Sequence, residues 1–517
     1  MDADTPTHPT GPPGGDDPVL AFGTARGRWV IAATVLGSGM AGLDATVVGI
    51  ALPAINRNFH SGVGTLQWVV TGYSLTLAAF LLLGGSLGDR LGRKRIFSIG
   101  VIWFVVASAC CGLAPNAGFL VAARILQGVG GALLTPASLA ILQASFRADD
   151  RSRAIGAWSG LGGVATAGGP IIGGYLIQAA SWRWVFFINI PLAVVVLAVT
   201  ARHVPETRDP TSAGKVDTVG AALAVIFLAA LTYGLIEGPS HGWTSPAILA
   251  SLVVAAVAGP GFLLAEHLRA HPMMPLGVFR SRQFSGANAA TFVVYGALGG
   301  ALFLLPIQLQ VVLHHSPTVA GLALVPVTVI MLLLSARSGQ LAARLGPRLQ
   351  MTVGPLIVGA GLILLVRGTH DANYFTAILP AVLVFGFGLA VTVAPLTSTA
   401  MAAAPAEHAG VASAVNNVVA RAAGLLAVAV LPLLAGITGA TALQPDHFAS
   451  GFRTAMIIAG VTAAAGGLLA FATIRNPEGS GTRLVNRYLR HYYCALVGPP
   501  LQSEQPAAAP PPAAPTQ

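Results

Sequence analysis

Two ionisable side chains stand inside long apolar runs of this sequence and are its strongest candidates for chemistry. Asp44 lies in LDATVVGIALP, residues 43–53, and Arg124 lies in RILQGVGGAL, residues 124–133. An ionised aspartate at the middle of a membrane-spanning helix raises the insertion free energy by about 2.5–3.5 kcal/mol. A carboxylate that takes up a proton loosens its hold on a nearby cation, and such a change can bias a two-state protein. Asp44 and Arg124 are therefore candidates for a proton-sensitive pair, and also for a pair that only neutralises two buried charges.

Other polar side chains fall inside the apolar runs and are candidates for the lining of a substrate cavity. They are Trp68, Tyr73, Gln308, Gln310, Asn416, Asn417 and Arg421. For any single one, a hydrogen bond between neighbouring helices is the simpler interpretation. Arg421 differs from the rest, because no acidic residue of its own run offers a partner. The adjacent His314 and His315 suit metal chelation poorly, and we expect no metal site.

The composition places these residues in a membrane protein. The 517 residues are 54% hydrophobic and 9% charged, with a mean hydropathy of +0.74. Soluble domains carry about 25% charged residues. The net charge of +10 does not indicate nucleic-acid binding, because the basic residues form short clusters between apolar runs of about 20 residues.

About fourteen apolar runs are long enough to cross a bilayer. They lie near residues 29–52, 66–87, 96–114, 119–143, 155–178, 184–201, 216–236, 246–266, 285–312, 317–341, 349–367, 374–400, 408–436 and 453–474. Most basic residues of the loops fall on one side of this pattern, so the positive-inside rule places both termini in the cytoplasm. That placement requires an even number of spans, a condition that twelve spans would also meet.

The sequence repeats itself. GSLGDRLGRK (85–94) is echoed by GQLAARLGPR (339–348) at an offset of 339 − 85 = 254, and IGAWSG (155–160) matches AGVASA (409–414) at the same offset. Parallel halves around a midplane cavity are typical of transporters. We expect a disordered cytoplasmic tail over 1–28, six-helix halves over 29–205 and 271–478, an inserted pair of transmembrane helices over 206–270, and a low-complexity cytoplasmic tail over 479–517.

Five motifs in order resemble those of the major facilitator superfamily, and in particular its branch of 14-span drug:proton antiporters of the EmrB/QacA type. They are LDATVVGIALP, GSLGDRLGRK, RILQGVGGAL, GGPIIGG (168–174) and SWRWVFFINIP (181–191), and the resemblance covers about residues 29–475. It implies an all-α integral membrane protein with the major facilitator fold. It also implies a role in proton coupling for Asp44 and Arg124.

The motif after the second span implies residues that control a conformational gate. They are Gly85, Asp89, Arg90, Gly92 and Arg93. A carboxylate at a helix end can pair with a cation or cap a helix N-terminus in one conformation and lose that partner in the other. The second copy of the motif has Ala343 in place of Asp89, so the predicted gate is one-sided.

The antiporter motif of the fifth predicted span brings small residues and a proline together. Its residues are Gly169, Pro170, Gly173 and Gly174. Glycines let helices pack closely, and a proline inside a helix favours a kink. The chain departs from the family pattern at Ala165 and at Gly49, where a Gly and an Asn are usual.

The resemblance implies a secondary active exporter that exchanges protons for amphipathic or lipophilic compounds such as antibiotics, by alternating access. A largely apolar cavity with one carboxylate would suit hydrophobic cations or antibiotic-like molecules. An exporter of one specific metabolite, amino acid or siderophore is the alternative, and a membrane enzyme or sensor without transport is the least favoured. We expect no cofactor and no use of ATP, because the chain has no GxxxxGK[ST] motif. The expected location is the inner membrane of a bacterial cell, with lipid, protons and a small molecule as partners.

Overall fold

The computed structural model describes residues 20–208, 217–269, 272, 274–368, 372–403, 409–439 and 441–476. In these ranges fourteen helical segments are long and apolar enough to cross a membrane, which confirms the predicted number of spans. Regular structure in the same ranges is helical apart from one isolated bridge between Leu20 and Phe146. The chain is therefore a multi-pass membrane protein.

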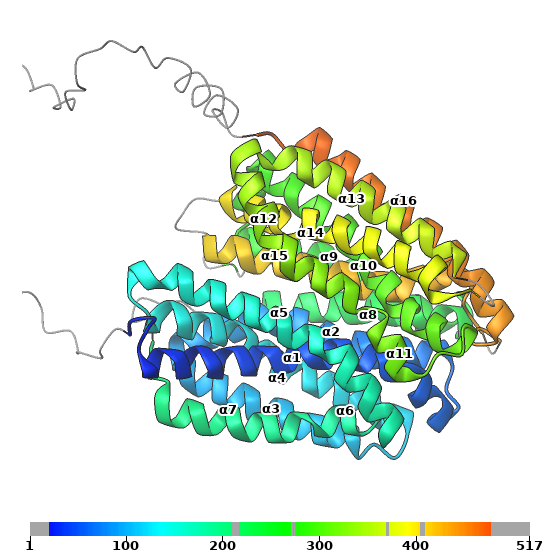
Figure 1. The fold of residues 1–517 in the computed structure, drawn as a ribbon, viewed down its shortest axis with the longest axis horizontal. Helices are drawn as coiled ribbons and strands as arrows, with labels where there is room; N and C mark the ends of the chain where they lie inside the picture. The colour runs from blue at the N-terminus through cyan, green and yellow to red at the C-terminus, as the bar shows by residue number, and fades with distance from the viewer. Residues whose placement is uncertain are drawn as a thin grey trace, which may run out of the picture.

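The helices form two packed groups (Figure 1). The N-terminal group contains α1 (Ala25–Phe59), α2 (Val63–Leu91), α3 (Arg93–Gly112), α4 (Ala117–Ser145), α5 (Ala148–Ala179), α6 (Trp184–Phe187) and α7 (Asn189–His203). The C-terminal group contains α10 (Arg282–Ile307), α11 (Pro317–Leu322), α12 (Val325–Leu345), α13 (Pro347–Leu364), α14 (Leu379–Ala402), α15 (Ala409–Leu434) and α16 (Pro445–Thr473). Between the groups in sequence lie α8 (Thr218–His241) and α9 (Pro246–Leu268). Short helical segments, η1 (Leu276–Arg280), η2 (Gln308–Val312), η3 (Leu365–Arg367) and η4 (Tyr374–Ile378), start or extend some helices.

Polar caps fix where several helices begin. Thr24 Oγ1 accepts a hydrogen bond from the main-chain N–H of Gly27, so α1 starts at Ala25, earlier than the predicted residue 29. Asn116 caps α4 and Asp217 caps α8 in the same way. Residues 1–19 and 477–517, which contain most of the two predicted tails, lie outside the described residues.

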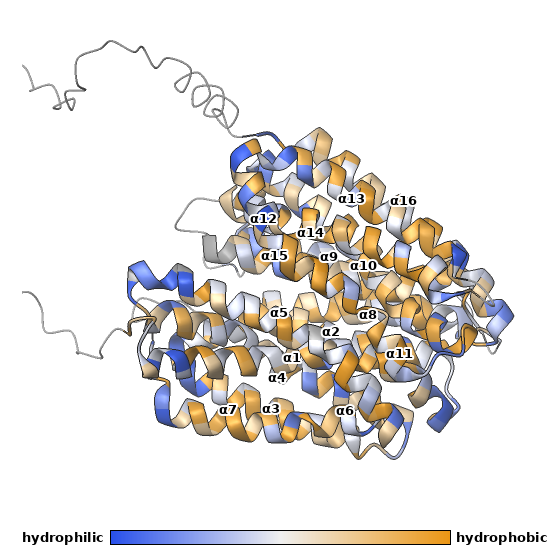
Figure 2. Ribbon diagram, in the orientation of Figure 1, coloured by the Kyte–Doolittle hydropathy of each residue, from blue (hydrophilic) through white to orange (hydrophobic). Residues whose placement is uncertain are grey.

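The outward faces of the helices are apolar, and polar residues gather at the two ends of the bundle (Figure 2). Large apolar side chains such as Val257, Leu264 and Phe471 are 68%, 58% and 54% exposed. So much uncovered apolar surface suits contact with lipid tails rather than water.

The predicted internal repeat has a structural counterpart. Gly92 and Gly346, which are 346 − 92 = 254 residues apart, have φ angles of 110° and 87° and each separates two consecutive helices. Positive φ favours glycine at both turns. Glu206 accepts main-chain hydrogen bonds at the start of α3, and Asn476 accepts one at the start of α13. The two groups thus build the same turn and cap it with a residue that follows their last helix.

The helices α8 and α9 pack on each other, and α8 also contacts both groups. Leu228 packs with Leu75 of α2 and Leu425 of α15. The indole Nε1 of Trp68 donates a 2.8 Å hydrogen bond to Glu237 Oε1, which ties α2 to α8.

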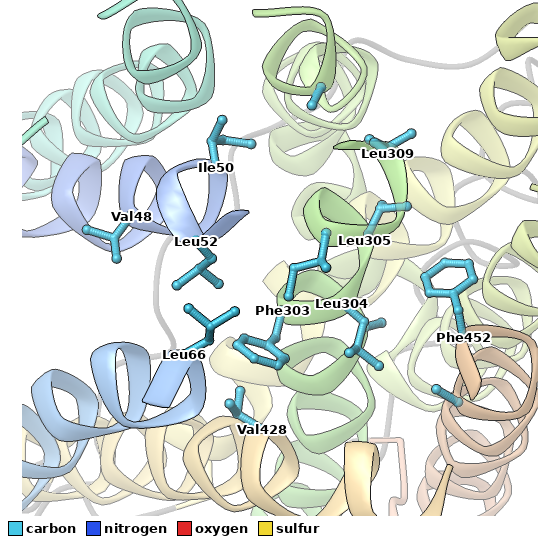
Figure 3. Close-up of a cluster of buried hydrophobic side chains, with 14 of the residues drawn as sticks. Val48, Ile50, Leu52, Leu66, Phe303, Leu304, Leu305, Leu309, Val428 and Phe452 are labelled. Carbon is cyan, nitrogen blue, oxygen red and sulfur yellow. The ribbon is translucent and has the colours of Figure 1, made fainter. Parts of the chain in front are cut away.

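The two groups meet at one end of the bundle and diverge at the other (Figure 1). We call the end with the start of α1 and the end of α16 the terminal end, and the opposite one the far end. At the far end, Leu52 and Leu66 pack in one cluster with Phe303 and Val428 (Figure 3). These contacts close the far end with apolar side chains from both groups.

Hydrogen bonds reinforce this closure. Gln67 Nε2 donates to the carbonyl oxygen of Val428 at 2.7 Å, and Gln310 Nε2 donates to that of Ile50 at 2.9 Å. Both bonds join the two groups, and both lie toward the far end.

Candidate functional site

Asp44 and Arg124 form an ion pair in the interior of the N-terminal group. Arg124 Nη1 lies 2.5 Å from Asp44 Oδ2, and the two side chains are 1% and 0% exposed. The structure thus brings together the two charges that stood out in the sequence. Removing one partner of such a pair leaves an uncompensated buried charge and typically destabilises a protein by about 3–5 kcal/mol.

Three polar residues complete the surroundings of the carboxylate. Gln127 Nε2 donates to Asp44 Oδ1 at 2.9 Å, while its Oε1 accepts from Arg124 Nη1 at 2.8 Å. Asn189 Nδ2 donates to Asp44 Oδ1 at 3.4 Å and to Ser108 Oγ at 3.0 Å. All three are fully buried, so the Asp44 carboxylate is enclosed by protein donors in this conformation.

Arg124 has further partners on α2. Its Nε donates to the carbonyl oxygen of Val69 at 3.0 Å, and its Cζ lies 4.2 Å from the centroid of the Tyr73 ring. The Tyr73 hydroxyl donates to the carbonyl oxygen of Ala41 at 3.3 Å. The thiol of Cys111 on α3 lies 3.6 Å from Gln127 Oε1. The cluster therefore joins α1, α2, α3, α4 and α7.

The antiporter motif packs α5 against both groups. A Cβ atom on Gly173 would lie 2.5 Å from Val47 Cγ1 of α1, and one on Gly174 would lie 2.8 Å from Thr318 Cα of α11. Gly169 faces Thr46 of α1 just as closely. Only glycine permits these approaches, so the motif lets α5 contact α1 and the C-terminal group at once.

The other half of α5 is unlike this one. Gly156, Gly160, Gly162 and Gly163 lie toward the terminal end, and no atom lies within 4 Å of the position that a Cβ on any of them would take. These glycines face no packed neighbour in the present conformation. Within α5, the motif glycines thus pack against neighbouring helices, whereas the glycines near the terminal end do not.

The residues of the predicted gate lie at the terminal end, where α2 turns into α3. Asp89 pairs with Arg93 one turn later, with Oδ1 2.8 Å from Nη2. A Cβ on Gly85 would lie 3.7 Å from Pro136 of α4. Arg90 lies in the last turn of α2. In this conformation the Asp89 carboxylate binds its own group rather than the C-terminal group.

The polar residues proposed for a cavity separate into two classes. Gln308 is 0% exposed and donates to the carbonyl oxygen of Gly368 at 2.7 Å. Asn416 donates to Asn288 Oδ1 at 3.1 Å and to Thr291 Oγ1 at 2.9 Å. These two residues, like Trp68 with Glu237, join helices to one another in this conformation.

Arg421 belongs to the second class. Its side chain is partly buried, its Nε is buried without a hydrogen-bond partner, and no described residue forms an ion pair or hydrogen bond with it. The titratable groups within electrostatic range are the phenols of Tyr73 and Tyr295. One turn earlier, Asn417 is exposed and bonds only to the carbonyl oxygen of Ser413.

The sequence model of the Major Facilitator Superfamily matches residues 34–428. This chain is a member of that superfamily. It is 37% identical over 386 residues to the multidrug resistance protein Stp of Mycobacterium tuberculosis, which covers 74% of this chain and 71% of the relative. It is 36% identical over 411 residues to the tetracenomycin C resistance and export protein of Streptomyces glaucescens. This match covers 79% of this chain and 76% of that relative.

Solved structures agree on the fold. A bacterial homologue of the human lysosomal transporter Spinster, in an inward-facing and unoccupied conformation, superposes with a TM-score of 0.63 at 17% identity, over 91% of this chain and 99% of that one. The protein is a transporter rather than an enzyme, because it belongs to the Major Facilitator Superfamily and resembles named resistance and export proteins. We refer to its N-terminal and C-terminal groups as the two halves.

Three polar residues of this transporter's buried cluster were missed by sequence reasoning, namely Gln127, Asn189 and Ser108. Gln127 stands one turn after Arg124 within RILQGVGGAL, and Asn189 stands within SWRWVFFINIP. An amide one turn away from a buried arginine on the same helix face is a signal for Gln127. The position of Asn189 depends on how α7 packs against α1, which the sequence does not reveal.

Proposed function

We propose that this transporter is a proton-coupled exporter of amphipathic or lipophilic compounds, located in the cytoplasmic membrane of a bacterium. The relatives named for multidrug resistance and for antibiotic resistance and export support the kind of cargo. The observation that carries proton coupling is the buried Asp44–Arg124 pair, enclosed by Gln127 and Asn189. No cofactor and no ATP enter the proposal.

The basic loops support an orientation with both termini in the cytoplasm. In that orientation the far end is extracellular, and the present conformation is open toward the cytoplasm. Rocking of the two halves would separate Leu52 and Leu66 from Phe303 and Val428 and would bring the terminal ends together. The cargo would then leave to the outside.

Asp44 would link this motion to protons. In the present conformation Arg124, Gln127 and Asn189 donate to the carboxylate and stabilise its charged form. A proton taken up from outside would remove the charge that holds these donors, which come from α4 and α7. Return to the cytoplasm-open conformation would restore the pair and release the proton inside. One carboxylate thus favours different packings of the same helices in its two protonation states.

Transport into inverted membrane vesicles tests this proposal. With an imposed pH gradient, the intact protein should concentrate an amphipathic dye, and Asp44→Asn should not. With the same dye concentration on both sides and no pH gradient, Asp44→Asn should still exchange the dye. The amide has the volume of the carboxylate and is uncharged, like a protonated Asp44.

Asp217→Asn is the matched control. Asp217 is also buried and also pairs with an arginine, with Oδ1 2.9 Å from Nη1 of Arg269, but it lies at the start of α8 outside the cluster. Its variant should still concentrate the dye. Equal concentration of the dye by Asp44→Asn and the intact protein would refute proton coupling through Asp44.

A dedicated exporter of one compound is the second candidate. It is favoured by relatives that are named for single antibiotics, such as the methylenomycin A resistance protein of Streptomyces coelicolor, which is 33% identical over 87% of this chain. Vesicle uptake of several structurally unrelated compounds separates the two candidates. Transport of only one compound would support the dedicated exporter.

A further inference from the structure

Arg421 is a cation with no hydrogen bond or ion pair to any described residue, and it lies at the seam between the two halves. It lies near the middle of α15, and α15 packs against α2 of the other half. Its Nε is buried and makes no hydrogen bond. A guanidinium carries five N–H donors, and a buried donor without an acceptor is costly, so the site favours an added acceptor.

The two carboxylates considered as that acceptor, Asp44 and Glu237, already have other partners. Asp44 already accepts from Arg124, Gln127 and Asn189. Glu237 accepts from the indole of Trp68 at the far end. The titratable groups within electrostatic range of Arg421 are instead the phenols of Tyr73 from one half and Tyr295 from the other.

The neighbours of Arg421 along α15 differ in the two directions. One turn later, Gly424 packs closely on Gly299 of α10, because a Cβ on Gly299 would lie 2.5 Å from Gly424 Cα. One turn in the other direction, Asn417 is exposed. A cation without an acceptor among the described residues suits an amphipathic compound that carries an acidic group, because a guanidinium binds a carboxylate through two parallel hydrogen bonds.

We infer that Arg421 binds the acidic group of the exported compound, and that the transporter prefers amphipathic carboxylates or phenolates over neutral or cationic compounds. This inference rests on the proposed export function and names its substrate class. It reverses the expectation that Asp44 attracts hydrophobic cations: the carboxylate is enclosed by its own donors, and the unpaired charge is positive.

A series of three probes with one apolar body tests the inference. Pyrenebutyrate, pyrenebutanol and pyrenebutyl-trimethylammonium differ in charge at one end, and their binding to the full-length protein in lipid nanodiscs can be followed by pyrene fluorescence. The intact protein should bind the carboxylate on the order of tenfold more tightly than the alcohol, and the ammonium most weakly. Arg421→Gln should bind carboxylate and alcohol equally, while Arg421→Lys should keep part of the preference.

Internal controls separate binding from folding. The alcohol should bind equally well to the intact protein and to Arg421→Gln, and Arg453→Gln, at an exposed arginine of α16, should keep the full preference for the carboxylate. The inference is overturned if the intact protein binds alcohol or ammonium as tightly as the carboxylate, or if Arg421→Gln keeps the preference. Loss of all three probes in Arg421→Gln would assign Arg421 a structural role and would also overturn it.

Charge movement gives a second readout. At any fixed number of protons, export of the carboxylate moves two more charges than export of the ammonium, so a membrane potential without a pH gradient should drive the carboxylate more strongly. An equal response of both probes in proteoliposomes contradicts the inference. Concentration of the ammonium probe that depends on Asp44 and on a pH gradient, without a carboxylate preference, would leave the exporter proposal intact and remove only the role of Arg421.

Discussion

Each half of this transporter places one arginine in its interior, and the two are held in opposite ways. Arg124 of the N-terminal half is 1% exposed and donates to Asp44, Gln127 and the Val69 carbonyl. Arg421 of the C-terminal half has no hydrogen bond or ion pair to a described residue. The first charge is satisfied within the protein, while the second leaves its donors available to another molecule.

The difference separates two tasks that a proton-coupled exporter must combine. A fully paired charge responds to the protonation of its partner, because nothing else competes for it. In our inference, the charge of Arg421 responds instead to the cargo. Tyr73 is placed to connect them, since its ring lies 4.2 Å from Arg124 Cζ and its phenol lies within electrostatic range of Arg421.

The largest expected effect on the free energy of unfolding comes from replacing Arg124, the arginine that is fully paired within the protein. Arg124→Gln leaves the Asp44 charge buried without its cation and should lower the free energy of unfolding by about 3–5 kcal/mol. The double variant Asp44→Asn with Arg124→Gln removes both charges and should recover a large part of that loss. Chemical unfolding in detergent, followed by far-UV circular dichroism, measures both. A double variant no more stable than Arg124→Gln would show that the pair is not the main interaction of Arg124.

An intermediate effect is expected from the two kinds of glycine in α5. Gly174→Leu forces a side chain against Thr318 and should weaken the far-end closure by about 1–3 kcal/mol. A cysteine at Leu52, which is 0% exposed, should then react faster with a membrane-impermeant maleimide from the far side. Gly160→Leu is the matched control, because it meets no atom within 4 Å, and it should leave that reaction unchanged or slower. Equal acceleration by both variants would argue against the far-end contact as a gate.

The smallest expected effect on stability comes from replacing Arg421, the arginine that has no partner among the described residues. Arg421→Gln breaks no hydrogen bond or ion pair with a described residue and removes a buried donor that has no acceptor, so the free energy of unfolding should not fall. The same unfolding measurement compares it with Arg124→Gln. A loss as large as that of Arg124→Gln would erase the contrast between the two halves.

The number of spans and the proximity of two charges could be predicted from the sequence, for different reasons. Long apolar runs define spans by length alone. Asp44 and Arg124 could be matched because isolated charges in apolar surroundings need partners.

The surroundings of the pair and the roles of the other polar residues could not be predicted. Gln308 and Asn416 look alike in sequence as polar residues of apolar helices, and Arg421 differs only because its own run has no acidic residue. The rotation of each helix decides that Gln308 reaches Gly368, that Asn416 reaches Asn288, and that Arg421 reaches no acceptor. That rotation depends on the packing of all neighbouring helices at once.

The hydrogen bond from Trp68 to Glu237 has a consequence for the motion of α8 and α9. The α8 helix touches both halves, but its contact with α2 includes this directional bond, whereas its cluster with Leu425 of α15 is apolar. Apolar contacts tolerate sliding better than a 2.8 Å hydrogen bond does. The inserted pair should therefore move as a rigid body with the N-terminal half, and the plane of slippage during each transport cycle should run along α15, on the helix that carries Arg421.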